Sequence, residues 1–143
     1  MLTAVALPAG NIISFASRRD EINTISLNQK LALEGRLHLP KIVGDSLQIF
    51  RVLNLSADLA LSSLGIWEPI PEKCSPAENI AAILVPGLAF DQDHFRLGYG
   101  KGHHDRLLAH LSCPSFGIGF LEQLTDRLPR EIHDRPVTKL LLF

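Results

Sequence analysis

Apolar residues near the start of the chain fall into two segments of different character. Residues 11–15 (NIISF) form a short apolar run that is typical of a buried strand. Residues 23–33 (NTISLNQKLAL) distribute apolar side chains over a longer segment, and Gly35 follows directly. Because a glycine commonly ends a helix, this second segment predicts a short helix.

Two alternating runs, residues 36–43 (RLHLPKIV) and 47–52 (LQIFRV), flank the pair Gly44-Asp45. Alternation on both sides of a Gly-Asp turn predicts a β-hairpin or two adjacent strands. Residues 64–76 contain three prolines, so this segment is predicted to be mostly loop.

The second half of the chain alternates strand-like and helix-like segments. Residues 80–85 (IAAILV) form a continuous apolar run closed by Pro-Gly, as in a strand buried on both faces of a parallel sheet. A segment with leucines along one side predicts the next helix, and residues 115–120 and 137–143 predict two further strands. Strands alternating with helices indicate an α/β sheet with helices on its faces.

Composition narrows the class of protein. The 143 residues are 46% apolar and 20% charged, so we expect one globular domain spanning residues 1–143. The formal net charge of −1, with no long run of one sign, gives no support to non-specific nucleic-acid binding. No apolar run approaches the about 20 residues that span a bilayer, and the first residues lack a basic leader, so neither a membrane partner nor a signal peptide is expected. Cys74 and Cys113 are the only cysteines, and we expect two reduced thiols in a cytoplasmic protein.

The segment after residue 85 combines glycines with charged residues at the expected end of a strand. Gly98, Gly100 and Gly102 alternate with Tyr99 and Lys101, directly before the predicted helix. Glycines let the backbone approach a ligand, and amides at a helix start favour phosphate. The order G-Y-G-K-G-H-H-D is neither a P-loop nor a dinucleotide fingerprint, so a flexible loop remains the alternative.

Three charged side chains belong to the same segment. Lys101 and Arg96 would add positive charge to a phosphate site, and Asp105 could hold a magnesium ion on the phosphates. The alternative is that Asp105 only complements the helix dipole.

Several motifs, taken together and in order, point to one known family. VPGLAFD is followed by RLGYGKG and then Asp-Arg-Leu, and EINT, LHLPKI and GIWEP precede them. The ending GFLEQLTDRLPREIHDRPVTKLLL completes the series, so the match extends over residues 12–142. This arrangement strongly resembles the 5-formyltetrahydrofolate cyclo-ligase family, also called methenyltetrahydrofolate synthetase.

The resemblance implies an ATP- and magnesium-dependent ring closure by a NagB/RpiA/CoA transferase-like fold, a three-layer α/β sandwich with a mainly parallel central sheet and helices on both faces. The formyl oxygen of 5-formyltetrahydrofolate would attack the γ-phosphate of ATP, nitrogen 10 would attack the iminium phosphate, and loss of phosphate would give 5,10-methenyltetrahydrofolate. Such phosphoryl transfer depends chiefly on positioning and charge neutralisation. Mg²⁺ is the implied cofactor and ATP the co-substrate, the folate can bear a polyglutamate tail, and a monomer is expected.

The resemblance also assigns roles to residues. It implies that Lys101 and Arg96 act in catalysis and that Asp105 and Asp134 bind magnesium. ATP binding falls to Arg96, Leu97, Gly98, Tyr99, Gly100, Lys101, Gly102, His103 and His104. Folate binding falls to Glu21, Ala16, Tyr99, Gly100, Lys101, Gly102 and His103.

The chain differs from the family pattern in two places. The family begins with a helix rich in lysine and arginine that contacts ATP, whereas this chain starts at about the strand after it. Arg18 and Arg19 stand in a different element and do not replace it. Either the start is truncated, or a partner or other residues neutralise the triphosphate, or ATP binding is weak. His103-His104 replaces Tyr-Tyr, and because imidazole titrates near neutral pH, we expect ligand affinity to depend on pH.

Two alternatives stay open at this point. One is a homologue that binds folate or nucleotide without turnover, and the other is a metal-dependent hydrolase. The candidate ligands of the hydrolase are Asp91, Asp93, His94, His103, His104 and Asp105. Elsewhere, His133 is expected to orient Asp134, and Trp67 to pack or cover a loop rather than stack on a ligand.

Overall fold

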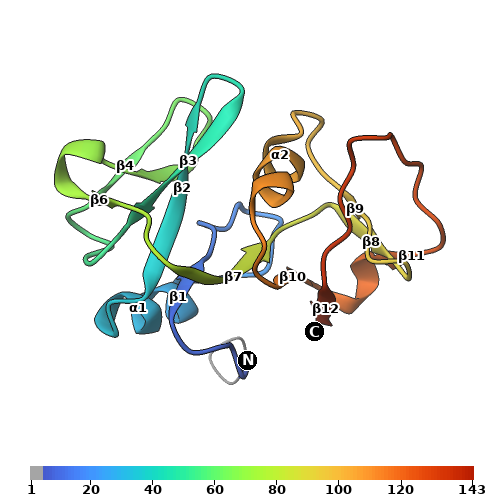
Figure 1. Cartoon of the computed structure of the whole chain (residues 1–143), viewed down its shortest axis with the longest axis horizontal. Coiled ribbons are helices and arrows are strands. Elements are labelled where there is room, and N and C mark those ends of the chain that lie inside the picture. Colours follow the sequence, from blue (N-terminus) through green and yellow to red (C-terminus); the bar gives the residue numbers. More distant parts are fainter. Residues whose placement is uncertain (1–4) are drawn as a thin grey trace.

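A computed structural model describes residues 5–143 and shows a mixed α/β fold built on a seven-stranded sheet (Figure 1). The order across the sheet is β12-β10-β7-β1-β2-β3-β6. The strands are β1 (Asn11–Ile13), β2 (Leu37–Val43), β3 (Ser46–Arg51), β6 (Ser75–Pro76), β7 (Ile80–Val85), β10 (Ser115–Gly119) and β12 (Lys139–Leu142). Every pairing from β12 to β2 is parallel, and β3 and β6 add antiparallel strands at one edge. The predicted α/β class with a mainly parallel sheet is therefore confirmed.

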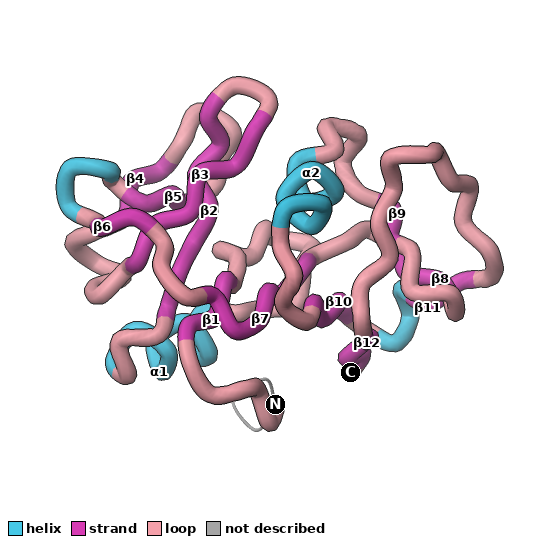
Figure 2. Tube along the Cα trace, viewed as in Figure 1, coloured by secondary structure: helices cyan, strands magenta, loops and turns pink. Residues whose placement is uncertain are grey.

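Shorter elements surround this sheet. Two α-helices are described, α1 (Ile25–Leu33) and α2 (His103–His110). The strands β8 (Ala89–Asp91), β9 (Arg96–Leu97) and β11 (Leu124–Thr125) form a three-stranded sheet, and β4 (Leu59–Leu61) pairs with β5 (Trp67–Pro69). Short 3-10 turns occur at η2 (Pro71–Lys73) and η3 (Leu121–Gln123). Loops make up much of the remaining chain, including the long segment before β12 (Figure 2).

Most predicted elements are present, with small shifts at their ends. The hairpin of β2 and β3 turns at Gly44, where φ is +60° and glycine is the residue that accepts this conformation without strain. The prediction of a mostly loop segment over residues 64–76 is wrong, because β5, η2 and β6 lie within it. Prolines are compatible with these strands because the strands are short, and β6 lies at the edge of its sheet.

The alternation of side chains along the parallel strands divides the core into two clusters. Ile12 belongs to the cluster that contains Leu27 and Leu31 of α1, whereas Ile13 belongs to the cluster against which Leu107 of α2 packs. Successive residues of a strand point to opposite faces, so each helix is anchored to its own set of strand side chains. The fuller expectation of three layers with helices on both faces stays a prediction.

A buried polar cluster fixes the loop that follows β1. The Thr24 hydroxyl and the Asn28 amide both donate to the carbonyl of Phe15, at 2.7 and 3.0 Å, and the Ser14 hydroxyl donates to the Asn28 side chain at 2.6 Å. Because buried polar groups are costly unless paired, this cluster ties the start of α1 to the end of β1. Over residues 5–143, no helix combines the length and apolarity needed to cross a membrane.

Candidate functional site

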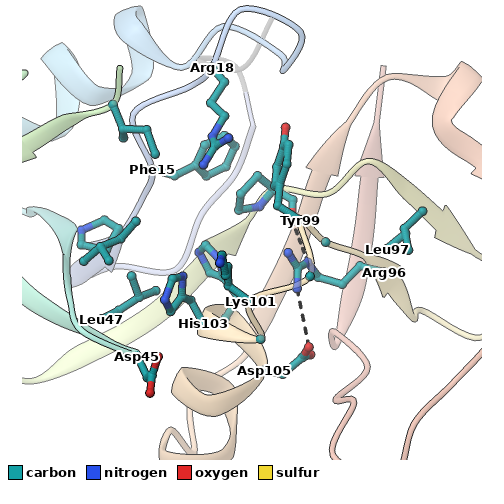
Figure 3. Close-up of a pocket in the computed structure, with 18 of the residues that line it drawn as sticks. Phe15, Arg18, Asp45, Leu47, Arg96, Leu97, Tyr99, Lys101, His103 and Asp105 are labelled. Atoms are coloured by element: carbon teal, nitrogen blue, oxygen red, sulfur yellow. Dashed lines mark hydrogen bonds and ion pairs between the residues drawn. The ribbon is translucent and has the colours of Figure 1, made fainter. Parts of the chain in front are cut away.

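A cavity of about 790 Å³ opens beside the ends of the parallel strands, where ligands bind in open α/β sheets. Four stretches of chain line it: residues 15–21 after β1, residues 40–68 of the β2–β5 region, residues 86–105, and residues 129–134. Every residue that the sequence assigned to the site lies on this lining. Figure 3 shows the labelled members of the first three stretches converging on the same space.

Glycines shape the segment between β9 and α2. At Gly98 an added Cβ would lie 2.7 Å from a guanidinium nitrogen of Arg96, so the absent side chain leaves room for Arg96 to fold back. Gly100 and Gly102 have φ of +89° and +67°, and Gly102 is the N-cap of α2. The backbone therefore adopts a left-handed conformation twice before the helix begins, which glycine accepts without strain.

Arg96 is the cation at the back of the cavity. Its side chain is only 6% exposed, its Nε donates to the carbonyl of Pro86 at 2.7 Å, and its Nη1 lies 3.9 Å from Oδ2 of Asp105 (Figure 3). Burial lowers the pKa of Arg96, and the carboxylates of Asp105 and Glu21 oppose this shift. Arginine stays charged in proteins, so the site contains a fixed, poorly hydrated positive charge.

The two histidines do not behave as exposed imidazoles. Burial lowers the pKa of His104 to about 3, with a further contribution from nearby Arg96, and its Nε2 is buried without a partner among the described residues. Burial and Arg106 lower the pKa of His103 as well. The expectation that this pair titrates near neutral pH is therefore wrong for His104, which stays neutral there because its charged form would lose its hydration.

Glu21 and Tyr99 both line the cavity, and each contacts Arg18 in the loop that follows β1. Oε1 of Glu21 accepts a hydrogen bond from the backbone N–H of Arg18 at 2.6 Å, and burial raises the pKa of Glu21. The Arg18 guanidinium lies over the Tyr99 ring, 4.2 Å from its centroid. This contact joins the loop after β1 to the glycine segment. It could not be predicted from the sequence, because Arg18 and Tyr99 are far apart along the chain.

One hydrogen bond connects Asp105 to the segment that contains Asp134. The backbone N–H of Arg135, the neighbour of Asp134, donates to Oδ1 of Asp105 at 3.2 Å. Oδ2 of Asp134 accepts from the backbone of Glu131 at 2.8 Å, and its Oδ1 lies 3.6 Å from Nε2 of His133. Two carboxylates fit Mg²⁺, which usually takes one or two from the protein and completes its shell with water and substrate phosphates.

The alternative metal-hydrolase site does not form. Within the described part of the chain, no group of three or more His, Cys, Asp or Glu side chains is placed to hold a metal ion. Asp91 is instead buried and accepts hydrogen bonds from the backbones of Asp93, Phe95 and Leu128, and Nδ1 of His94 lies 3.1 Å from a backbone carbonyl. Asp91 thus caps the turn between β8 and β9 and does not line the cavity.

The sequence missed several lining residues. Trp67 lines the cavity with half of its surface exposed, although packing was expected, and Glu68 lies beside it, fixed by the backbone N–H of Ile42 at 2.9 Å. Arg130 also lines the cavity and pairs with Asp91 at 2.9 Å. The motif GIWEP was visible in the sequence, yet nothing in it indicated that β5 faces the glycine segment.

The fold and cavity define an α/β protein with a large cavity, lined by charged residues, at the ends of its parallel strands. Residues 4–142 match the pattern of the 5-formyltetrahydrofolate cyclo-ligase family, and the chain belongs to that family. The 5-formyltetrahydrofolate cyclo-ligase of Mycolicibacterium smegmatis is 31% identical, over 98% of this chain and 77% of the relative. The enzyme of that name from Mus musculus is 29% identical, over 89% and 70% of the two chains.

Solved structures agree with this assignment. The Aquifex aeolicus 5,10-methenyltetrahydrofolate synthetase is similar with a TM-score of 0.77 and 34% identity, over 92% of this chain and 67% of the other. A Mycoplasma pneumoniae 5,10-methenyltetrahydrofolate synthetase has a TM-score of 0.64 at 22% identity, over 92% and 73%, and this likeness concerns the fold.

Proposed function

We propose that the chain is an ATP-dependent 5-formyltetrahydrofolate cyclo-ligase, which closes the folate ring to 5,10-methenyltetrahydrofolate and releases ADP and phosphate. One observation carries this proposal: the residues assigned from the motifs lie far apart in the chain, yet all of them line one cavity of about 790 Å³. Family membership supplies the reaction, the cavity has a volume suited to large ligands, and its lining includes the cations Arg96 and Lys101 as well as several carboxylates.

In this proposal the glycine segment holds ATP. Arg96 and Lys101 neutralise charge that develops on the phosphates, and the amides from Gly98 to Gly102 donate to phosphate oxygens at the start of α2. Leu97, Tyr99, His103 and His104 complete the nucleotide side. Since phosphoryl transfer is governed by positioning and electrostatics, the buried guanidinium of Arg96 and the exposed ammonium of Lys101 suit the catalytic role.

The folate occupies the opposite side, where Ala16 and Glu21 follow β1. The partly buried carboxylate of Glu21 can accept hydrogen bonds from the N–H groups of the pteridine ring, and Tyr99, Lys101 and His103 line the boundary between the two substrates. We add Trp67 to this side, because it presents a large aromatic surface to the cavity and the folate contains two flat ring systems.

Asp105 and Asp134 would hold Mg²⁺ on the phosphates of ATP, where the ion neutralises the charge of the transferred group. We also propose that residues 1–143 form one domain that acts as a monomer in the cytoplasm, with the three-layer arrangement of the NagB/RpiA/CoA transferase-like folds. The contribution of all four stretches of chain to one cavity supports the single domain.

The proposal is tested by adding 5-formyltetrahydrofolate, ATP and magnesium to the full chain and following the near-ultraviolet absorbance of the methenyl product. We expect an ATP-dependent rise, and a loss of about 100-fold or more in rate for Lys101→Ala and for Asp105→Ala, because each removes a charge aimed at the transferred phosphoryl group. Arg127→Ala is the matched control, since Arg127 is exposed and outside the cavity lining.

Two results would contradict the assignment. Absence of any ATP-dependent product would reject the enzyme, and thermal stabilisation by folate alone would then favour a homologue that binds without turnover. Near-native rates in both Lys101→Ala and Asp105→Ala would be compatible with the proposed reaction but would show that the catalytic site is assigned wrongly.

A further inference from the structure

The side chain of Arg106 connects two walls of the cavity. Its Nε donates to the backbone carbonyl of Asp45, at the tip of the β2–β3 hairpin, at 2.8 Å. Its Nη2 donates to the backbone carbonyl of Lys101, in the glycine segment, at 2.6 Å. Asp45 and Lys101 both line the cavity, whereas Arg106 itself is exposed and does not. One guanidinium therefore fixes two lining residues from different elements.

Two neighbouring residues, His103 and Gly102, support the connection made by Arg106. His103, one turn before Arg106 on α2, lies beside the backbone of Gly44, so the hairpin tip meets the helix at a second point. At Gly102 an added Cβ would lie 3.2 Å from Nη1 of Arg106, so the glycine leaves room for the guanidinium. Figure 3 shows Asp45 and Leu47 of the hairpin beside His103 and Lys101.

The contact with Lys101 also sets the direction of an amide. The carbonyl of Lys101 and the N–H of Gly102 belong to one planar trans peptide, so they point in opposite directions. While Arg106 holds the carbonyl, the N–H of Gly102 is directed away from Arg106 and cannot rotate independently. Gly102 is one of the amides assigned above to the phosphates of ATP.

We propose that Arg106 is a positioning residue, a clamp that joins the hairpin tip to the glycine segment and so orients the Lys101–Gly102 peptide for the phosphates. This inference rests on the function proposed above for its effect on ATP, but the clamp itself is a property of the protein without ligand. Arginine suits the role because its planar fork offers several donors in a fixed geometry, which the single ammonium of lysine does not.

The test compares Arg106→Gln, Arg106→Lys and the control Arg127→Gln in the full chain. Hydrogen–deuterium exchange without ligand is followed over residues 42–47 and 98–103, and kcat/KM for ATP is measured at saturating 5-formyltetrahydrofolate. We expect Arg106→Gln to speed exchange in both segments and to lower kcat/KM for ATP about tenfold, the effect of losing one to two hydrogen bonds. In both exchange rate and kcat/KM for ATP, Arg106→Lys should lie between Arg106→Gln and wild type. Arg127→Gln should match wild type in both measurements.

Each outcome decides the inference. Unchanged exchange in either segment of Arg106→Gln would overturn the clamp, and faster exchange with unchanged kcat/KM for ATP would overturn its positioning role. Uniformly faster exchange across the whole chain would mean that Arg106 only stabilises the fold, which also overturns the proposal. If Arg106→Gln does not fold, Arg106→Lys supplies both readouts. If the wild-type protein makes no product, the proposed function fails, and exchange still decides whether the clamp exists.

Discussion

At the scale of single residues, His104 shows how burial changes a side chain that the sequence presents as titratable. Its pKa is about 3 in the folded protein, against a reference value of 6.5. Below pH 6.5 the unfolded chain therefore takes up a proton that the folded chain does not bind. The contribution of His104 to stability is fully present above pH 6.5 and is lost as the pH falls toward 3.

We predict that His104→Phe becomes more stable than wild type as the medium is acidified. The difference in unfolding free energy should move in favour of the variant by up to about 1.4 kcal/mol per pH unit below 6.5, because the proton linkage at this site is removed. Urea unfolding at pH 7.5, 6.0 and 5.0 measures it. His110→Phe is the control, since His110 is exposed on the same helix. A constant difference across these pH values would show that His104 titrates in the folded protein as it does in the unfolded one.

At the scale of elements, Asp91 joins two segments that bear site residues. Its side chain is 1% exposed and accepts from Asp93 and Phe95, in the turn before Arg96, and from Leu128 and Arg130, in the segment before Asp134. Burial opposes ionisation, but these hydrogen bonds outweigh it and lower the pKa of Asp91. One buried carboxylate thus aligns both segments.

We predict that Asp91→Asn lowers the unfolding free energy by about 2 kcal/mol at neutral pH, because it removes the charge of a buried carboxylate that accepts hydrogen bonds from three backbone N–H groups and from the partly exposed Arg130. Asp93→Asn is the control: Asp93 also pairs with Arg130, at 2.8 Å, but is exposed, so its loss should cost less than about 1 kcal/mol. Since the folded pKa of Asp91 is lowered, its contribution is present above the reference value of 3.8 and is lost as the pH falls through the folded pKa. The difference in unfolding free energy between Asp91→Asn and wild type should therefore become smaller as the pH falls. Equal destabilisation by the two variants would contradict the central role of Asp91.

The elements also show where prediction from sequence succeeds. Residues 80–85 were predicted with the bounds of β7, because a strand buried on both faces is apolar throughout and Pro-Gly ends it. The two-residue strands β9 and β11 were missed, since their extended shape depends on pairing with β8, as in the register of Leu124 with Phe90. The glycine segment was found because its chemistry is local, whereas the stack of Arg18 on Tyr99 and the clamp of Arg106 depend on contacts between distant segments.

At the scale of the whole molecule, the cavity exists only in the folded chain, since its four lining stretches come from different parts of the sequence. A ligand that bridges them binds the native state and not the unfolded one, so it must stabilise the fold by mass action. Cations and carboxylates both line the cavity, so we expect the stabilisation by ATP to depend on a divalent metal ion. In the proposed site, Arg96 and Lys101 would favour the triphosphate, whereas Asp105 and Asp134 would repel it unless a divalent cation lay between them.

We therefore predict that ATP with magnesium raises the melting temperature of the protein by about 5–10 °C at a hundredfold excess over Kd, corresponding to about 2.7 kcal/mol. ATP with EDTA should stabilise much less, because the carboxylates then repel the phosphates. Asp134→Asn should bring the two conditions closer together, by weakening the response with magnesium and relieving repulsion without it. Asp126→Asn, an exposed residue outside the cavity lining, should respond like wild type. If ATP shifts the wild-type melting temperature equally with magnesium and with EDTA, the two carboxylates do not hold the metal, and the assignment of Asp105 and Asp134 is wrong.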